Sequence, residues 1–149
     1  MNVRAATVDD VEELCRLGNT VDEFKVSAEV VTFWPKETVV SIVIKSEVPI
    51  YVAEDSEKII GFIITNYNPV FGKAIIENVF VLPGQRGKNV GHELLAAVLT
   101  KLRKLACPYV CALMEVSYPD AIKFYGDEGF SRGIDCVWMD LVMSELFKN

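Results

Sequence analysis

Apolar residues recur along this chain with two different spacings, which predict where helices and strands form. Across residues 89–105 they recur every three or four positions, as on a helix that buries one stripe. A shorter stripe of this kind follows Thr7, a residue suited to capping a helix, and ends at Gly18 and Asn19. Residues 119–127 open with a proline, which favours a third helix.

The other apolar stretches are short and bounded by turn residues, as β-strands are. We predict strands at residues 3–6, 50–54, 58–65, 74–82, 109–115 and 136–143, with a hairpin turn at 55–57. Residues 35–44 begin like a helix at Pro35 but are rich in β-branched residues. Helix and strand fit this segment almost equally, and we predict helix.

The predicted order is β-α-α-β-β-β-α-β-α-β, with antiparallel hairpins ahead of a right-handed β-α-β crossover. This order indicates a mixed α/β fold with a mostly antiparallel central sheet and helices on both faces. At 149 residues the chain has the length of one domain, which we assign to residues 1–149.

The most informative segment is the turn at residues 83–88, between a strand and the long helix. A helix start offers unpaired N–H groups and favours an anion. Glycines at 84, 87 and 91 let a ligand approach the backbone, and Arg86 and Lys88 add two cations. These features together predict a phosphate cradle. The Walker phosphate-binding pattern does not match, because Lys88 is not followed by serine or threonine. The dinucleotide-binding fingerprint does not match either, because the spacing of the glycines differs.

Two motifs in this region resemble those of the GNAT family of N-acetyltransferases. Val-Leu-Pro at 81–83 followed by Arg-Gly-Lys-Asn-Val-Gly at 86–91 is similar to the family's central signature. Downstream, residues 118–130 match its later motif at Ala121, Phe124, Tyr125, Gly129 and Phe130. The chain departs from the pattern at two places. Asn89 replaces a glycine, although asparagine tolerates the left-handed conformation, and Tyr118 replaces an asparagine that contacts the cofactor.

The resemblance implies a GNAT-like fold and acetyl-CoA as co-substrate. The pantetheine arm would pair with residues 79–81 and the pyrophosphate would meet the backbone of residues 87–92. His92 is expected to flank the helix start rather than to move protons. The implied cofactor-binding residues are Val79, Phe80, Val81, Arg86, Gly87, Lys88, Asn89, Val90, Gly91 and His92.

The same resemblance places a general acid at Tyr125 and a base at Glu77. A carboxylate among apolar neighbours in mid-strand needs a reason, and strand alternation would put Glu77 on the face of Val79 and Val81. Glu115, on the adjacent predicted strand, is the alternative base. The predicted activity is acetyl transfer to a primary amine by direct attack in a ternary complex. A catalytically silent acyl-CoA-binding or regulatory domain of this fold is the alternative.

Net charge and composition limit the classes of partner that the chain is expected to bind. A net charge of −6 argues against a nucleic-acid surface and favours cationic partners. No apolar run is long enough for a membrane span or signal peptide, so a cytoplasmic protein is expected. Four scattered cysteines and a single histidine make poor zinc ligands, and no metal is predicted. The acceptor, a small-molecule or peptide amine, is not identified by the sequence. Homodimers are common in the family, and the sequence leaves that state open.

Overall fold

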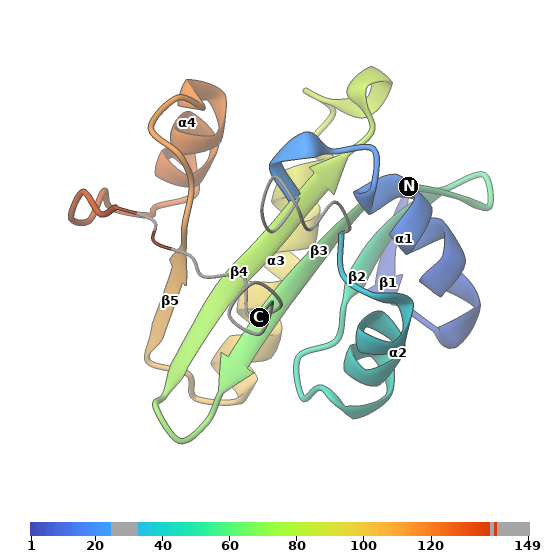
Figure 1. The fold of residues 1–149 in the computed structure, drawn as a ribbon, viewed down its shortest axis with the longest axis horizontal. Coiled ribbons are helices and arrows are strands. Elements are labelled where there is room, and N and C mark those ends of the chain that lie inside the picture. Colours follow the sequence, from blue (N-terminus) through green and yellow to red (C-terminus); the bar gives the residue numbers. More distant parts are fainter. Residues whose placement is uncertain (25–32, 138, 140–149) are drawn as a thin grey trace, which may run out of the picture.

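A computed structural model describes residues 1–24, 33–137 and 139. Its centre is a five-stranded sheet in the order β1-β2-β3-β4-β5 (Figure 1). The first four strands pair antiparallel with their neighbours, and β5 joins β4 in parallel. The strands are β1 (Asn2–Ala5), β2 (Tyr51–Asp55), β3 (Lys58–Asn68), β4 (Lys73–Val81) and β5 (Tyr109–Ala112).

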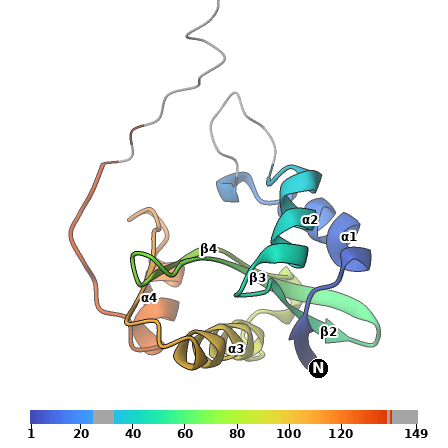
Figure 2. The ribbon, with the colours of Figure 1, turned by 90° about the horizontal axis from the view of Figure 1, so that it is seen from below.

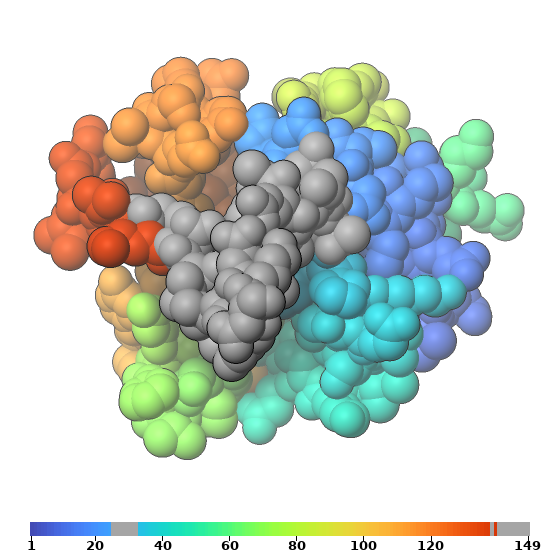
Figure 3. All heavy atoms as spheres, in the orientation of Figure 1, coloured from blue at the N-terminus to red at the C-terminus, as the bar shows by residue number. Residues whose placement is uncertain are grey.

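Helices cover both faces of this sheet (Figure 2). Helices α1 and α2 pack against each other on one face, where the space-filling view shows them side by side (Figure 3). Helices α3 and α4 lie on the other face, with α3 in the crossover from β4 to β5. The helices are α1 (Val11–Gly18), α2 (Lys36–Lys45), α3 (Val90–Lys104) and α4 (Pro119–Asp127), with 3-10 turns at Val8–Asp10, Asp22–Phe24 and Pro83–Gln85.

The sheet therefore separates two apolar clusters. Beneath α1 and α2 the buried side chains include Leu14, Val39, Phe62 and Phe80. Beneath α3 they include Ala53, Ile63, Ala74, Leu94 and Val98. Burial of this apolar surface on both faces is the main term that holds the sheet and helices together.

Most of the predicted elements are confirmed, including the choice of helix over strand for residues 35–44. The hairpin turn between β2 and β3 holds Ser56 and Glu57 at φ of 49° and 63°, as a tight turn of the favoured twist requires. The predicted strand at 109–115 is shorter, because β5 ends at Ala112. The predicted last strand, 136–143, lies mostly outside the described residues.

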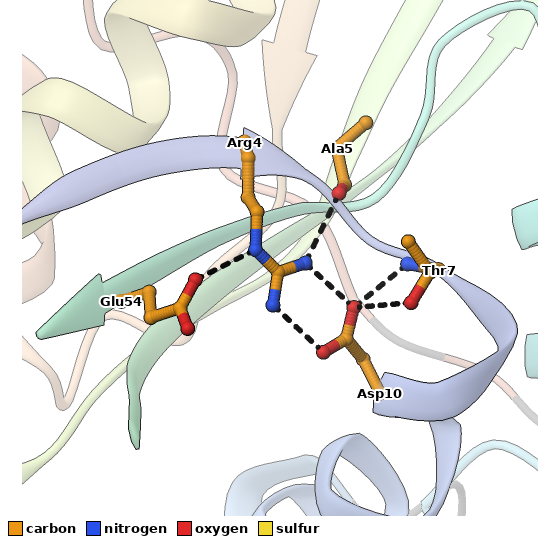
Figure 4. Close-up of polar contacts among 5 residues, drawn as sticks. All are labelled: Arg4, Ala5, Thr7, Asp10 and Glu54. Atoms are coloured by element: carbon orange, nitrogen blue, oxygen red, sulfur yellow. Dashed lines mark hydrogen bonds and ion pairs between the residues drawn. The ribbon is translucent and has the colours of Figure 1, made fainter. Parts of the chain in front are cut away.

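A partly buried polar network links the start of the chain to the sheet (Figure 4). Arg4 on β1 donates to both carboxylate oxygens of Asp10, at 2.7 and 2.9 Å, and to Glu54 on β2 at 2.7 Å. Asp10 also accepts from the backbone N–H of Thr7 at 2.7 Å. The Arg4 guanidinium lowers the pKa of Asp10 to about 2.

This pairing predicts acid-sensitive stability. Asp10 has a pKa of about 2 in the fold and an ordinary value of 3.8, so its contribution is complete above about pH 4 and disappears as the pH falls through 2. We expect Asp10→Asn to lower the free energy of unfolding by about 2 kcal/mol at pH 7. Urea unfolding of both proteins should then converge near pH 2. As a control, Glu13→Gln breaks an exposed pair with Arg16 and should cost much less. A difference between wild type and Asp10→Asn that does not change with pH would contradict this account.

Candidate functional site

Strand β4 is irregular at Glu77. Glu77 and Asn78 both stand opposite Ile64 of β3, which makes a β-bulge and bends the strand. Pairing between β4 and β5 ends at the pair of Ile76 with Ala112, directly before the bulge. Beyond this point the two strands diverge (Figure 1). The bulge thus opens a gap between neighbouring strands inside the sheet.

The gap leaves one edge of β4 without a strand partner among the described residues. The carbonyl of Val81 points to this edge, because it accepts from Arg86 Nε at 3.3 Å. Backbone groups alternate between the two edges along a strand, so Val79 presents its N–H and C=O to the same side. Phe80 turns the other way, pairing with Phe62 of β3 and stacking on its ring at 5.3 Å. The backbone groups of Phe80 therefore face β3, and this residue only separates Val79 and Val81 along the edge.

The turn after β4 has the geometry expected of an anion cradle. Gly87 and Asn89 have φ of 74° and 67°, so Asn89 adopts the left-handed conformation that its glycine counterpart would. The first N–H bonded within α3 is that of Glu93, to the carbonyl of Asn89 at 3.1 Å. The N–H groups before it have no helical partner and lie at the positive end of the helix. The side chains of Arg86 and Lys88 are exposed beside them.

Gly91 has a packing role in addition to the predicted one. A Cβ at Gly91 would lie 3.2 Å from the ring of Phe124, so the glycine lets α4 pack on the first turn of α3. Phe124 and Phe130 hold the ring of Tyr125 edge-on, with centroids 5.1 and 5.2 Å away. Burial raises the pKa of the Tyr125 hydroxyl above its ordinary value of 10. The phenol therefore stays protonated through the neutral range.

His92 makes a second link between these helices. Its Nδ1 lies 2.8 and 3.0 Å from the carboxylate oxygens of Glu128, just after α4. The hydrogen bond and the negative charge of Glu128 raise the pKa of His92. This bond is strongest while His92 is protonated and weakens as the pH rises through its pKa in the fold. The arrangement supports the flanking role that the sequence predicts.

Glu77 occupies the bulge as a half-buried carboxylate that has no hydrogen bond or ion pair with the described residues. The predicted face of this side chain does not follow from alternation. Ile76 and Val79 both pack toward α3 although they are three residues apart, so the alternation shifts at the bulge. The carboxylate is available to a ligand, and it stands where β4 and β5 separate.

Glu115 has a different setting from the predicted one. It lies beyond the end of β5, exposed, and accepts a hydrogen bond from Ser117 Oγ at 3.0 Å. The strand does not extend to Glu115 because the bulge turns β4 away and removes its ladder partner. Glu77, which lies within the sheet, is therefore the better-placed carboxylate.

The aromatic residues of the segment after α1 divide between core and site. Phe33 is 1% exposed and belongs to the core, and Phe24 packs against it partly buried, with the two ring centroids 5.8 Å apart. Trp34 instead donates from Nε1 to Asn78 Oδ1 at 2.6 Å, next to the bulge. Sequence reasoning did not single out Asn78, although a polar asparagine within an apolar strand was a usable signal.

Two further observations concern the rest of the described chain. No group of three or more His, Cys, Asp and Glu side chains gathers there as a metal site would require. Within the same residues no helix is both long enough and apolar enough to cross a membrane.

Comparisons with known proteins place this geometry in context. A sequence profile of the acetyltransferase (GNAT) family matches residues 18–130. A search of proteins with curated functions returned no match.

Solved structures resemble the chain over nearly its whole length. A ribosomal-protein-alanine N-acetyltransferase from Brucella melitensis is 20% identical, with 88% of this chain and 85% of that one covered and a TM-score of 0.74. A transcriptional regulator from Bacillus halodurans C-125 is 21% identical (94% and 99% covered, TM-score 0.74). An aminoglycoside acetyltransferase from an uncultured soil metagenomic sample is 15% identical (95% of each chain covered, TM-score 0.77). At these identities the likeness shows the fold.

Proposed function

The chain belongs to the GNAT family of acetyltransferases, and on that premise we propose that it transfers the acetyl group of acetyl-CoA to a primary amine. The amine attacks the thioester carbonyl directly while both substrates are bound. The observation that carries the proposal is the edge of β4 at Val79 and Val81, which has no strand partner among the described residues and runs into the turn before α3.

These two features match the two chemical ends of the co-substrate. Val79 and Val81 would hydrogen-bond the amides of the pantetheine arm as a neighbouring strand would. The N–H groups from Gly87 to His92 would hold the pyrophosphate, with Arg86 and Lys88 as counter-charges. Acetyl-CoA supplies an activated acetyl thioester whose thiolate leaves on transfer. The residues of the chain bind, orient and exchange protons around it.

Two proton transfers remain for side chains. An alkylamine with a pKa near 10 is protonated at pH 7, and making it nucleophilic costs about 4 kcal/mol. We assign removal of that proton to the Glu77 carboxylate, acting through a water molecule. The hydroxyl of Tyr125, kept protonated by burial, would donate to the departing thiolate. The supporting observations are the position of Glu77 at the gap and the packing of Tyr125 against the start of α3 through Phe124.

Acetyl-CoA should raise the melting temperature by several degrees, because a ligand at a hundredfold excess over its Kd stabilises the native state by about 2.7 kcal/mol. Pantetheine lacks the phosphates and should give a much smaller shift. Asn89→Gly should bind acetyl-CoA as well as wild type or better, since glycine adopts positive φ without strain. Asn89→Ala, which keeps that strain, should bind less tightly.

The measurements are differential scanning fluorimetry for binding and thiol release with a panel of primary amines for turnover. Equal shifts from acetyl-CoA and pantetheine would remove the phosphate cradle from the proposal. A large loss of affinity in Asn89→Gly would instead give the Asn89 side chain its own contact. Binding without release of CoA for any amine would identify the chain as a catalytically silent acyl-CoA-binding domain.

A further inference from the structure

A hollow of about 460 Å³ lies over the β3–β4 hairpin, lined by Asn66, Asn68, Phe71, Lys73 and Ile75. It is on the face of the sheet that α1 and α2 share. Ile64 packs into the cluster beneath those helices, whereas Tyr67 packs toward α3. Alternation along β3 then places Asn66 and Asn68 on the face of Ile64.

Asn78 does not line the hollow but continues the same row of residues toward the bulge. On the same face, the cross-strand pairs run from Ile64 with Asn78 to Asn66 with Ile75 and then to Asn68 with Lys73. Each step is two residues along β3, or about 7 Å. The row therefore begins beside the candidate base, Glu77, and extends about 13 Å away from it.

Hydrogen bonding fixes which atoms this row presents. The indole N–H of Trp34 can only donate, so the atom of Asn78 that it meets at 2.6 Å must be the amide oxygen. The Asn78 NH₂ group is the end left over. No described residue accepts a hydrogen bond from this NH₂ group, and its nitrogen is not among the fully buried polar atoms that lack a partner. Within the described residues, this NH₂ group is therefore the part of Asn78 left for a ligand oxygen to contact.

Asn68 is oriented in the same sense. Its amide oxygen accepts from the backbone N–H groups of Val70 and Phe71, at 3.0 and 3.2 Å. Its NH₂ group is again the part left to contact a ligand. Lys73 adds an ammonium group, and no carboxylate lines the hollow among the described residues. The row of residues from Asn78 to Asn68 thus offers N–H donors at both ends. It offers no carboxylate that could pair with a second ammonium group of a substrate.

From this donor row we infer that the acceptor is a primary amine whose body carries neutral hydroxyl or carbonyl oxygens, which Asn78 and Asn68 hold. The inference rests on the proposed acetyl transfer and specifies its substrate class. It also revises the general expectation of a cationic partner, which came from net charge. The reactive amine meets Glu77, while the rest of the substrate lies among donors and is best uncharged. A polyamine would place a second ammonium beside Lys73.

The test compares kcat/KM, from CoA release, for four amines. Trialanine amide and a disaccharide with one amino group carry oxygens, hexylamine carries none, and spermidine carries additional ammonium groups. We expect both oxygen-bearing amines to exceed hexylamine and spermidine by about tenfold, the ratio that one neutral hydrogen bond supports. Comparing trialanine amide with the amino disaccharide shows whether the enzyme prefers peptide carbonyl oxygens or sugar hydroxyl oxygens. Wild-type preference for hexylamine or spermidine overturns the inference.

Variants separate this role from a structural one. Asn78→Asp still accepts from Trp34 but loses its donors, so the KM advantage of the oxygen-bearing amines over hexylamine should disappear. Asn68→Asp, which keeps its turn hydrogen bonds, should reduce the advantage of the longer acceptors. Trp34→Phe keeps an aromatic ring, frees the Asn78 amide to rotate, and should reduce it partly. Asn2→Asp, on β1, is the matched control. An unchanged ratio in both Asn78→Asp and Asn68→Asp contradicts the inference.

Failure of the proposed function has a different signature. No CoA release with any of the four amines would argue against acetyl transfer itself. Calorimetry of the same amines in the presence of CoA then still decides the inference, because selective binding of the oxygen-bearing pair supports it and equal binding overturns it.

Discussion

Tyr125→Phe should lower kcat by about a hundredfold or more, the usual scale for loss of a general acid. The change removes one hydroxyl and keeps the ring between Phe124 and Phe130. The affinity for acetyl-CoA and the melting temperature should therefore change little. Because burial raises the pKa of this phenol, its hydroxyl would stabilise the departing thiolate as a hydrogen-bond donor that keeps its proton.

Tyr51→Phe is the matched control for this variant. Tyr51 lies on β2, distant in the sheet from the gap between β4 and β5, and burial raises the pKa of its hydroxyl as well. Steady-state CoA release with a reactive amine measures both proteins. Turnover of Tyr125→Phe at the wild-type level would exclude the residue from catalysis. An equal loss in both variants would point to a general effect of removing buried hydroxyl groups.

Glu77→Gln should reduce kcat/KM by about a hundredfold at pH 7, the lower end of the range for general bases. Glutamine keeps the shape of the side chain but cannot accept the proton. The defect should shrink as the pH approaches 10, because the amine then loses its proton to bulk solvent. A pH profile of CoA release from about pH 7 to 10 measures this convergence, a range set by the pKa of the amine.

Glu115→Gln provides the comparison, since this carboxylate is exposed and bonded to Ser117. We expect a small effect that does not depend on pH. A Glu77→Gln defect that stays constant across the profile would make Glu77 a positioning group and would direct attention to Glu115. Wild-type activity in both variants would leave the base to another group.

The sequence predicts the parts of this fold that depend on local patterns. Residues 89–105 form the long helix because their apolar spacing fits one stripe, and Asn89 takes the left-handed position assigned to it. The helix at residues 35–44 was nearly balanced against a strand, and burial of Val39 beneath it favours the helix. Local spacing and turn chemistry are sufficient for these features.

The features that shape the site depend on how strands and distant residues pair in space. The spacing of apolar residues along the sequence does not reveal this pairing. A bulge at Glu77 needs no special residue, so alternation along the sequence does not fix the face of this side chain. The early end of β5 before Glu115 follows from the same bulge. The bond between Trp34 and Asn78 joins residues 44 positions apart and depends on how α2 docks on the sheet. Gly91 fits the ligand-binding pattern, yet its contact with Phe124 appears only in three dimensions.

The gap inside the sheet has a consequence for the protein before it meets its substrate. An unpaired strand edge is a template on which a foreign strand can assemble, and such edges promote aggregation. Within the described part of the chain the unpaired length is only a few residues, a bulge twists it away from a flat ladder, and the charged side chain of Arg86 bonds one of its carbonyls. These are the devices by which natural sheets protect their outer edges. A short, bent edge of this kind is a poor template for a second protein chain, although its length would suit a short strand-like ligand.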